Sequence, residues 1–215
     1  MPDRFATAID LICFTVVGGA LAVLGAGAGR GGRSALPWRL LGAGEGLDTV
    51  AARLARTTLG RAPGWRTQLG ASSDTSRHPS LAPLSVGYVA VVPAGTDAPP
   101  GHLWHRLPAA GAFGTRQQRG MVAAIATLRD RMDVEPIAFR LLPAAFTLGE
   151  LQALYELLLG RRLHKASFRR ALQGAFLVEP LEEWRTEGRG RPAQLYRYAP
   201  RRQRGSRPVR FALLA

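Results

Sequence analysis

The residues best suited to bind a partner form a basic segment in the last third of the chain. Phe168 and Leu172 are spaced i, i+4, which predicts the buried side of a short helix from Lys165 to about Gly174. The outer side of this helix carries long side chains that can donate to phosphates and base edges in a DNA major groove: Lys165, Arg169, Arg170 and Gln173. The pattern predicts a DNA-recognition helix.

A second basic element follows in the turn formed by residues 188–192, Gly-Arg-Gly-Arg-Pro. Its glycines let the backbone approach DNA closely. Arg189 and Arg191 could enter a narrow minor groove, whose negative potential attracts guanidinium groups. The alternative is a solvated basic hairpin. The position of the turn after a recognition helix favours DNA binding.

The surrounding residues predict the elements that would position these donors. Thr147 and Glu150 have the spacing of a capping box, which predicts the start of a helix that ends near Gly160. Its apolar face is predicted from a helical repeat: Leu151, Leu154, Tyr155 and Leu158. Strands are predicted at Phe176–Val178 and Gln194–Tyr198, with the acidic pair Glu182 and Glu183 between them. Helix, helix and hairpin is the order of a winged helix.

The charge of the chain agrees with a polyanionic partner. The formal net charge is +14, and all but one of the 29 basic side chains are arginine, so a bias in genome composition contributes to this excess. Residues 146–215 carry 14 basic and 6 acidic side chains, the highest charge density in the chain. Binding to a polyanion through this end should weaken steeply with salt.

The cysteine and histidine content argues against a metal site. Cys13 is the only cysteine, which excludes an internal disulfide and fits a reducing cytoplasm. The histidines lack metal-ligand spacing, and we expect them on the surface or in loops: His78, His102, His105 and His164. We therefore expect no metal and no cofactor.

An apolar run from Leu11 to Ala28 is just long enough for a membrane span. Asp10 precedes it and Gly18-Gly19 divides it, which favours two buried strands, Ile9–Val17 and Leu21–Leu24, joined by a turn. A membrane-tethered protein is the alternative, and we expect no membrane contact.

The rest of the chain predicts a mixed domain of strands and helices. Strands are expected at Trp65–Leu69 and Leu84–Val92, and helices at Leu47–Leu59 and Met121–Met132, with residues 94–118 as a connection. We expect a domain boundary near Pro143, which gives an α+β protein in three parts: residues 1–143, a winged helix at 144–200 and a basic tail at 201–215.

The segment around the first predicted helix resembles the Nudix hydrolase signature, in which glycine, glutamate, arginine and further glutamates recur at fixed gaps. Glu45, Arg53 and Gly60 stand at matching positions, but Arg39 replaces the opening glycine. The three helix glutamates of the signature are also replaced: Leu54, Thr57 and Thr58. Nudix chemistry needs a cluster of carboxylates to hold divalent cations against a diphosphate. One remaining carboxylate predicts that this domain is not an enzyme.

The order of elements along nearly the whole chain resembles the Nudix-related transcriptional regulators, which fuse a Nudix-like sensing domain to a C-terminal winged helix. The resemblance implies a homodimer that represses genes of NAD metabolism or sugar use by binding a pseudo-palindromic operator in double-stranded DNA. It implies a set of DNA-binding residues: Lys165, Ser167, Arg169, Arg170, Gln173, Arg189 and Arg191. The alternative is a Nudix-fold nucleotide hydrolase whose C-terminal domain binds nucleic acid.

The same resemblance implies a small-molecule effector, either a nucleotide such as ADP-ribose or a sugar or sugar phosphate. Arg39 and Arg56 flank the position where metals would bind, and their guanidinium groups could neutralise a diphosphate directly. With Glu45 and Arg53 they form the predicted effector site. Alternatively, a Glu45–Arg53 pair is purely structural, and the domain serves only for dimerisation.

Overall fold

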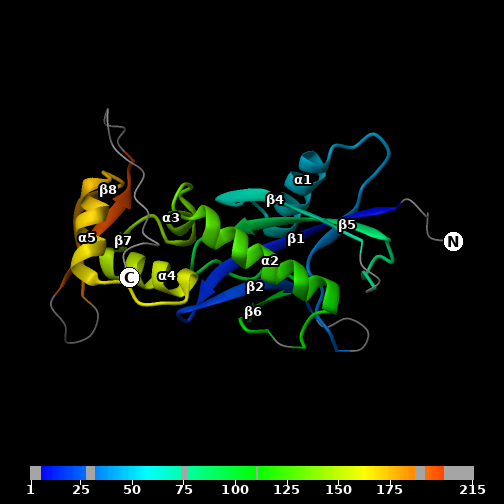
Figure 1. The fold of residues 1–215 in the computed structure, drawn as a ribbon, viewed down its shortest axis with the longest axis horizontal. Coiled ribbons are helices and arrows are strands. Elements are labelled where there is room, and N and C mark those ends of the chain that lie inside the picture. Colours follow the sequence, from blue (N-terminus) through cyan, green and yellow to red (C-terminus); the bar gives the residue numbers. More distant parts are fainter. Residues whose placement is uncertain (1–5, 28–31, 74–76, 110, 187–191, 201–215) are drawn as a thin grey trace. The chain divides into compact units, whose positions relative to one another are not determined.

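A computed structural model describes residues 6–27, 32–73, 77–109, 111–186 and 192–200. The chain divides into two compact units, Met1–Thr127 and Leu128–Ala215 (Figure 1). The predicted turn at 188–192, apart from Pro192, and the predicted tail at 201–215 lie outside the described residues. This division falls within a helix, Thr115–Arg131. The domain boundary that we expect near Pro143 stays a prediction.

The first unit is built on a mixed sheet in the order β4-β5-β1-β2-β6, with β3 paired to the start of β1. β1 and β5 run parallel, and the other pairs are antiparallel. The strands are β1 Thr7–Val17, β2 Ala20–Ala26, β3 Trp38–Leu40, β4 Trp65–Ser72, β5 Leu84–Val91 and β6 His102–Arg106. Two helices belong to this unit wholly or in part: α1 Leu47–Leu59 and α2 Thr115–Arg131.

The interpretation of residues 11–28 as paired strands is confirmed. β1 and β2 form an antiparallel pair across Gly18 and Gly19, whose φ angles of 56° and 75° favour glycine. No helix in the described part of the chain is long and apolar enough to cross a membrane.

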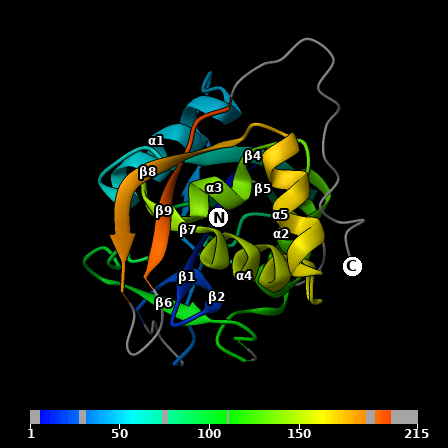
Figure 2. The ribbon, with the colours of Figure 1, turned by 90° about the vertical axis from the view of Figure 1, so that its left-hand side faces the viewer.

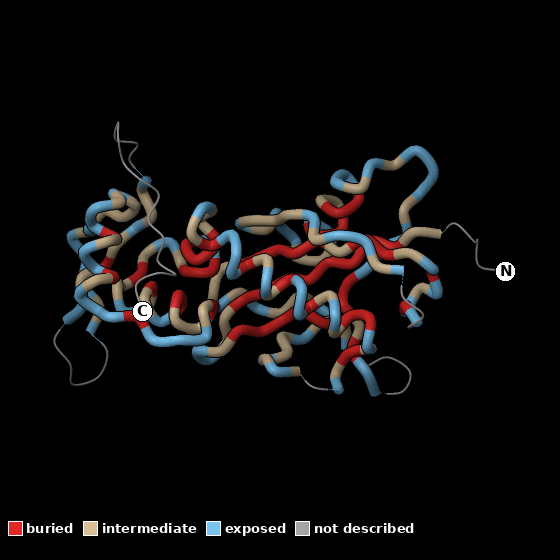
Figure 3. The backbone as a smooth tube through the Cα atoms, in the orientation of Figure 1, coloured by how far each residue is buried: buried red, intermediate tan, exposed pale blue. Residues whose placement is uncertain are grey.

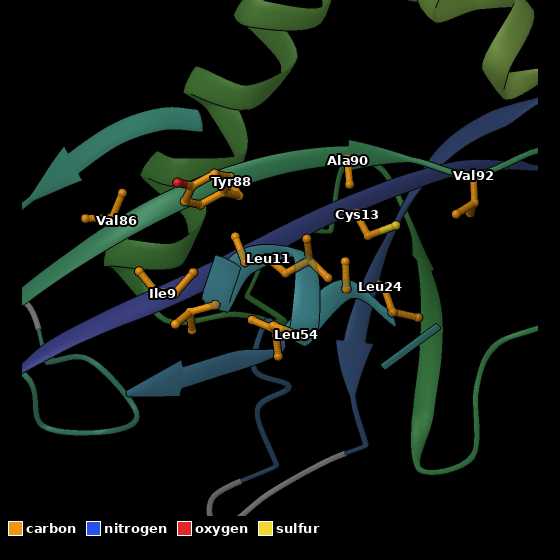
Figure 4. Close-up of a cluster of buried hydrophobic side chains, with 12 residues drawn as sticks. Ile9, Leu11, Cys13, Leu24, Leu54, Val86, Tyr88, Ala90 and Val92 are labelled. Carbon is orange, nitrogen blue, oxygen red and sulfur yellow. The ribbon is translucent and has the colours of Figure 1, made fainter. Parts of the chain in front are cut away.

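β1 is buried on both faces because helices cover both sides of the sheet (Figure 3). Alternate residues of the strand point to opposite sides. Ile9, Leu11 and Cys13 pack with α1 and with Val86, Tyr88 and Ala90 of β5 (Figure 4). On the other side, α2 comes so close that a Cβ added at Gly120 would lie 3.3 Å from Ile12 Cδ1. This strand therefore fixes the two helices of the unit.

The predicted connection at 94–118 is wrong in part. It contains β6, which pairs with β2, and the helix predicted from Met121 begins at Thr115. The sequence of residues 102–106, His-Leu-Trp-His-Arg, does not alternate regularly between apolar and polar residues, and none of the five is fully buried. The segment therefore gave little sign of a strand. Neither β3 nor α3, a single helical turn at Ile137–Leu141, was predicted from the pattern, because both are too short for periodicity.

The second unit has the predicted order of a winged helix. After α3 come β7 Phe146–Thr147, α4 Leu148–Leu159, α5 Lys165–Gly174, β8 Val178–Arg185 and β9 Ala193–Tyr198. The three strands pair in the order β7-β9-β8 (Figure 2). The strand expected at Phe176–Val178 begins only at Val178 and continues past the acidic pair, because β8 pairs with β9 on both sides of an irregularity between Pro180 and Trp184.

The ends of α4 are fixed as predicted. The Glu150 amide donates to Thr147 Oγ1 at 3.1 Å, and the Thr147 amide donates to Glu150 Oε2 at 2.7 Å, which completes the capping box. Gly160 ends the helix with a φ of 71°, in the left-handed region.

Glu156 holds the turn between α4 and α5. Its Oε1 accepts from the Leu163 amide at 2.9 Å and from Gln152 Nε2 at 3.0 Å, and its Oε2 accepts from Arg162 at 3.1 Å. These hydrogen bonds, that of the Leu163 amide first, hold the pKa of Glu156 below its ordinary value. The carboxylate therefore fixes where α5 starts.

This arrangement predicts that Glu156→Gln destabilises the second unit in a pH-dependent way. Because the folded pKa is lowered, the charge of Glu156 contributes its full stabilisation above the ordinary value of 4.5, and this contribution is lost as the pH falls below it. Urea unfolding followed by circular dichroism should show a gap between wild type and variant that is widest at neutral pH and narrows on acidification. Glu183→Gln, at an exposed position of β8, is the matched control. A gap of constant size at every pH would contradict the prediction.

Candidate functional site

The predicted recognition helix α5 presents its donors as expected. Phe168 and Leu172 are fully buried, and the Phe168 ring meets Tyr155 of α4 edge-on with centroids 5.5 Å apart. Four of the predicted residues are exposed: Lys165, Arg169, Arg170 and Gln173. The apolar pair thus docks the helix on α4 and leaves a cationic face outside.

Ser167 differs from the other predicted donors because it is half-buried and takes part in the helix cap. Its amide and hydroxyl both lie against His164 Nδ1, at 3.4 Å and 3.0 Å. This cap sets the first turn of α5, so the structure places Ser167 in positioning the helix.

A hollow of about 500 Å³ lies beside α5. Lys165 and Arg169 form its cationic wall, and Thr147, Leu148 and Gly149 contribute the start of α4. The wall from the hairpin comprises Pro192, Ala193, Gln194 and Tyr196. The hollow brings two predicted donors next to one end of the hairpin.

Gln194 and Tyr196 were not predicted as site residues. Their alternation identified a strand but gave no sign that one end of that strand faces α5. Arg189 and Arg191 lie outside the described residues, so their place at DNA stays a prediction.

One ion pair connects the hairpin to α4. Arg185 at the end of β8 donates to Glu150 Oε1 at 2.7 Å, so one carboxylate serves both the capping box and the hairpin. Both side chains are about one-third exposed, so this pair aligns the hairpin more than it stabilises the fold.

In the first unit, the predicted effector residues separate into a pair and two exposed cations. Glu45 accepts from Arg53 and from the Gly42 amide, and these bonds, that of Arg53 first, lower the pKa of Glu45. Arg39 in β3 and Arg56 in α1 are exposed. The structure thus contains the Glu45–Arg53 ion pair on which the alternative of a purely structural role depends.

Two of the signature glutamate positions are used for packing and for hydrogen bonds within the helix. Leu54 belongs to the apolar cluster between α1 and the sheet, and the Thr57 hydroxyl bonds to the carbonyls of Arg53 and Leu54 within its own helix. Across the residues that the structure describes, no three histidine, cysteine or acidic side chains are grouped as metal ligands.

Polar side chains that the sequence did not single out meet on the opposite face of the sheet. Asp10 is nearly buried, and its Oδ1 lies 2.9 Å from His78 Nε2. His78 follows β4 in a loop, as expected, but it is buried rather than exposed. Arg116 and Gln117 of α2 are also buried there, and they were missed because they fall in the segment predicted as a connection.

The Ser80, His78 and Asp10 side chains form a chain of hydrogen bonds that resembles a catalytic triad. However, His78 Nδ1 also accepts from the Ser80 amide at 3.0 Å, and Ser80 Oγ accepts from the Ala82 amide at 3.2 Å. Both groups are therefore used to shape the loop, and we interpret the chain as structural.

Comparisons with known proteins agree with both units. Residues 138–198 match the family model of the NrtR DNA-binding winged helix domain. The ADPR responsive transcriptional repressor NtrR of Acinetobacter baylyi is 41% identical over 76 residues, which make up 35% of this chain and 30% of that protein. The match thus spans about a third of the curated relative.

Solved structures extend the likeness to nearly the whole chain. Shewanella oneidensis NrtR, complexed with a 27mer DNA, has a TM-score of 0.76 at 25% identity and covers 90% of this chain and 94% of its own. A MutT/nudix family protein from Enterococcus faecalis shares the fold, with a TM-score of 0.67 at 17% identity over 93% of this chain and 90% of its own. The chain therefore joins a Nudix-like fold to a winged helix of the NrtR DNA-binding family, the domain pair of the Nudix-related transcriptional regulators that its sequence resembles.

Proposed function

We propose that this protein is a ligand-responsive transcriptional repressor that binds an operator through its winged helix. The observation that carries the proposal is the division of α5 into a buried apolar pair, Phe168 and Leu172, and an exposed cationic face within a domain of a DNA-binding family. A helix docked in this way can enter a major groove while its long side chains contact phosphates and base edges.

The hollow beside α5 supports this proposal through the side chains that line it. Lys165 and Arg169 supply positive charge there, so a phosphate of the DNA backbone is a group that fits the hollow. Arg170 and Gln173, farther along α5, are then placed to contact base edges. We propose that Arg189 and Arg191 extend the contact into the minor groove and that two chains bind one pseudo-palindromic site.

For the first unit we propose the role of an effector sensor. The A. baylyi relative is named as responsive to ADPR, so ADP-ribose is the first ligand to test, ahead of sugars and sugar phosphates. Arg39 and Arg56 are exposed and do not themselves form the Glu45–Arg53 ion pair, although the charge of Arg39 also acts to lower the pKa of Glu45; both remain candidates for the diphosphate. Ligand binding would then change the affinity of the winged helix for its operator.

We further propose that the first unit is not a hydrolase. Leu54 occupies core space, and Thr57 bonds to its own helix, so these two signature positions of α1 offer no carboxylate to a divalent cation. The alternative, a nucleotide hydrolase with a nucleic-acid-binding domain, would need metal ligands from elsewhere in the chain.

The DNA-binding proposal predicts that Arg169→Ala weakens operator binding and lowers its salt dependence. Removing one phosphate contact should reduce the slope of log affinity against log salt by about 1. Fluorescence anisotropy with DNA from upstream of the gene, beside random DNA, would measure both quantities and the number of chains bound. Arg56→Ala, which removes an exposed arginine from the first unit, is the matched control. Equal affinity and slope in wild type and Arg169→Ala would overturn the assignment of α5.

The sensing proposal predicts that ADP-ribose binds the full chain and changes its affinity for operator DNA. Isothermal titration would detect the binding, and the same anisotropy assay with ligand would detect the change. Incubation with Mg²⁺ should leave ADP-ribose intact, as judged by chromatography of the nucleotides. Absence of heat at millimolar ligand would remove ADP-ribose as the effector, and release of AMP would support the hydrolase alternative.

A further inference from the structure

A cavity of about 280 Å³ lies in the first unit between the sheet and α2, on the side of the sheet away from α1. Its floor comes from alternate residues of the central strands, Asp10 and Ile12 of β1 and Ser85 and Gly87 of β5, which point to the same side of the sheet. Ile12, Leu36 and Leu69 give it apolar walls. The cavity is therefore separate from the residues of the degenerate Nudix signature.

Two buried side chains of α2 line this cavity, and each has one nitrogen donor without a hydrogen-bond partner. Gln117 is 3% exposed, and its Oε1 accepts from the Leu36 amide at 3.2 Å, which fixes the side-chain amide and leaves Nε2 unpaired. Arg116 is 4% exposed, and its terminal nitrogens donate to the carbonyls of Ser72, Ala82 and Pro83, which leaves Nε unpaired. Buried donors that lack partners cost free energy, so a ligand that accepts from them would be favoured.

The floor of the cavity supplies a hydrogen-bond acceptor, the side chain of Asp10. Since the Ser80 amide donates to His78 Nδ1, the ring proton on Nε2 points to Asp10 Oδ1, at 2.9 Å. The lining also carries positive charge, because the Arg116 guanidinium is buried in the wall and Arg119 of α2 is an exposed lining residue. The cavity thus offers donors on one wall and an acceptor in its floor, between apolar surfaces.

These features match the edge of a nucleobase, which presents ring acceptors beside an exocyclic amino donor on a flat apolar ring. We propose that the cavity receives the nucleobase end of a nucleotide effector, with Gln117 Nε2 and Arg116 Nε donating to the ring and Asp10 accepting from the amino group. The proposal rests on the sensing role of the first unit. It assigns the diphosphate to the outside of the cavity.

The test uses isothermal titration of the full chain with ADP-ribose and two variants. Gln117→Leu removes the donor, and Ala123→Trp places a large ring at the exposed rim of the cavity. Each should weaken ADP-ribose binding by about tenfold or more, the factor that corresponds to one lost hydrogen bond. Val122→Trp, a neighbouring exposed position of α2 outside the cavity lining, is the matched control and should bind as wild type does.

Competition identifies which end of the ligand enters. Adenosine should displace ADP-ribose, whereas ribose 5-phosphate and pyrophosphate should not. Operator binding without ligand should be unchanged in both variants, and this result would show that they fold. If Gln117→Leu does not bind the operator, the ADP-ribose affinity of Ala123→Trp alone tests the inference. Unchanged ADP-ribose affinity in the folded variants, or displacement by ribose 5-phosphate alone, would overturn the inference and leave the sensing role standing. Absence of binding by wild type would overturn the inference and also remove ADP-ribose as the effector.

Discussion

The burial of β1 on both faces is the constraint on which the first unit depends. This strand pairs with β2, β3 and β5, and its alternating residues pack α1 on one side and approach α2 on the other. A central strand covered twice must be apolar along nearly its whole length. Asp10 and Thr15 are the buried polar exceptions, and the position of Asp10 gives the α2 side of the sheet a charged group.

In the second unit, the structural requirement is to hold the strongly cationic helix α5 in one orientation. Tyr155 and Phe168 give the contact between α4 and α5, and Glu156 fixes the turn between them. Glu150 caps α4 and also pairs with Arg185 of the hairpin. Two hydrogen-bonded carboxylates thus position α4, α5 and the hairpin relative to one another.

The sequence predicted most of the second unit because its signals are local. The capping box at Thr147, the glycine at 160 and the Phe168–Leu172 spacing each depend on residues within a few positions of one another. The cavity in the first unit was not predictable in this way. Asp10 and Gln117 meet only because β1 and α2 pack together, and no pattern within either segment indicates the other. Short elements such as β6 gave too few residues for a period.

The packing of Leu54 bears on how this protein could change over evolutionary time. In the Nudix signature this position holds a carboxylate, whereas here an apolar side chain fills part of the core between α1 and the sheet. A single reversion to glutamate would bury a charge among Ile9, Leu11 and Val50 before the other ligands of a metal exist to neutralise it. The substitution at Leu54 would therefore lower stability before it could contribute to a metal site. Packing at this one position thus limits which substitutions the helix can accept, whatever ligand the domain binds.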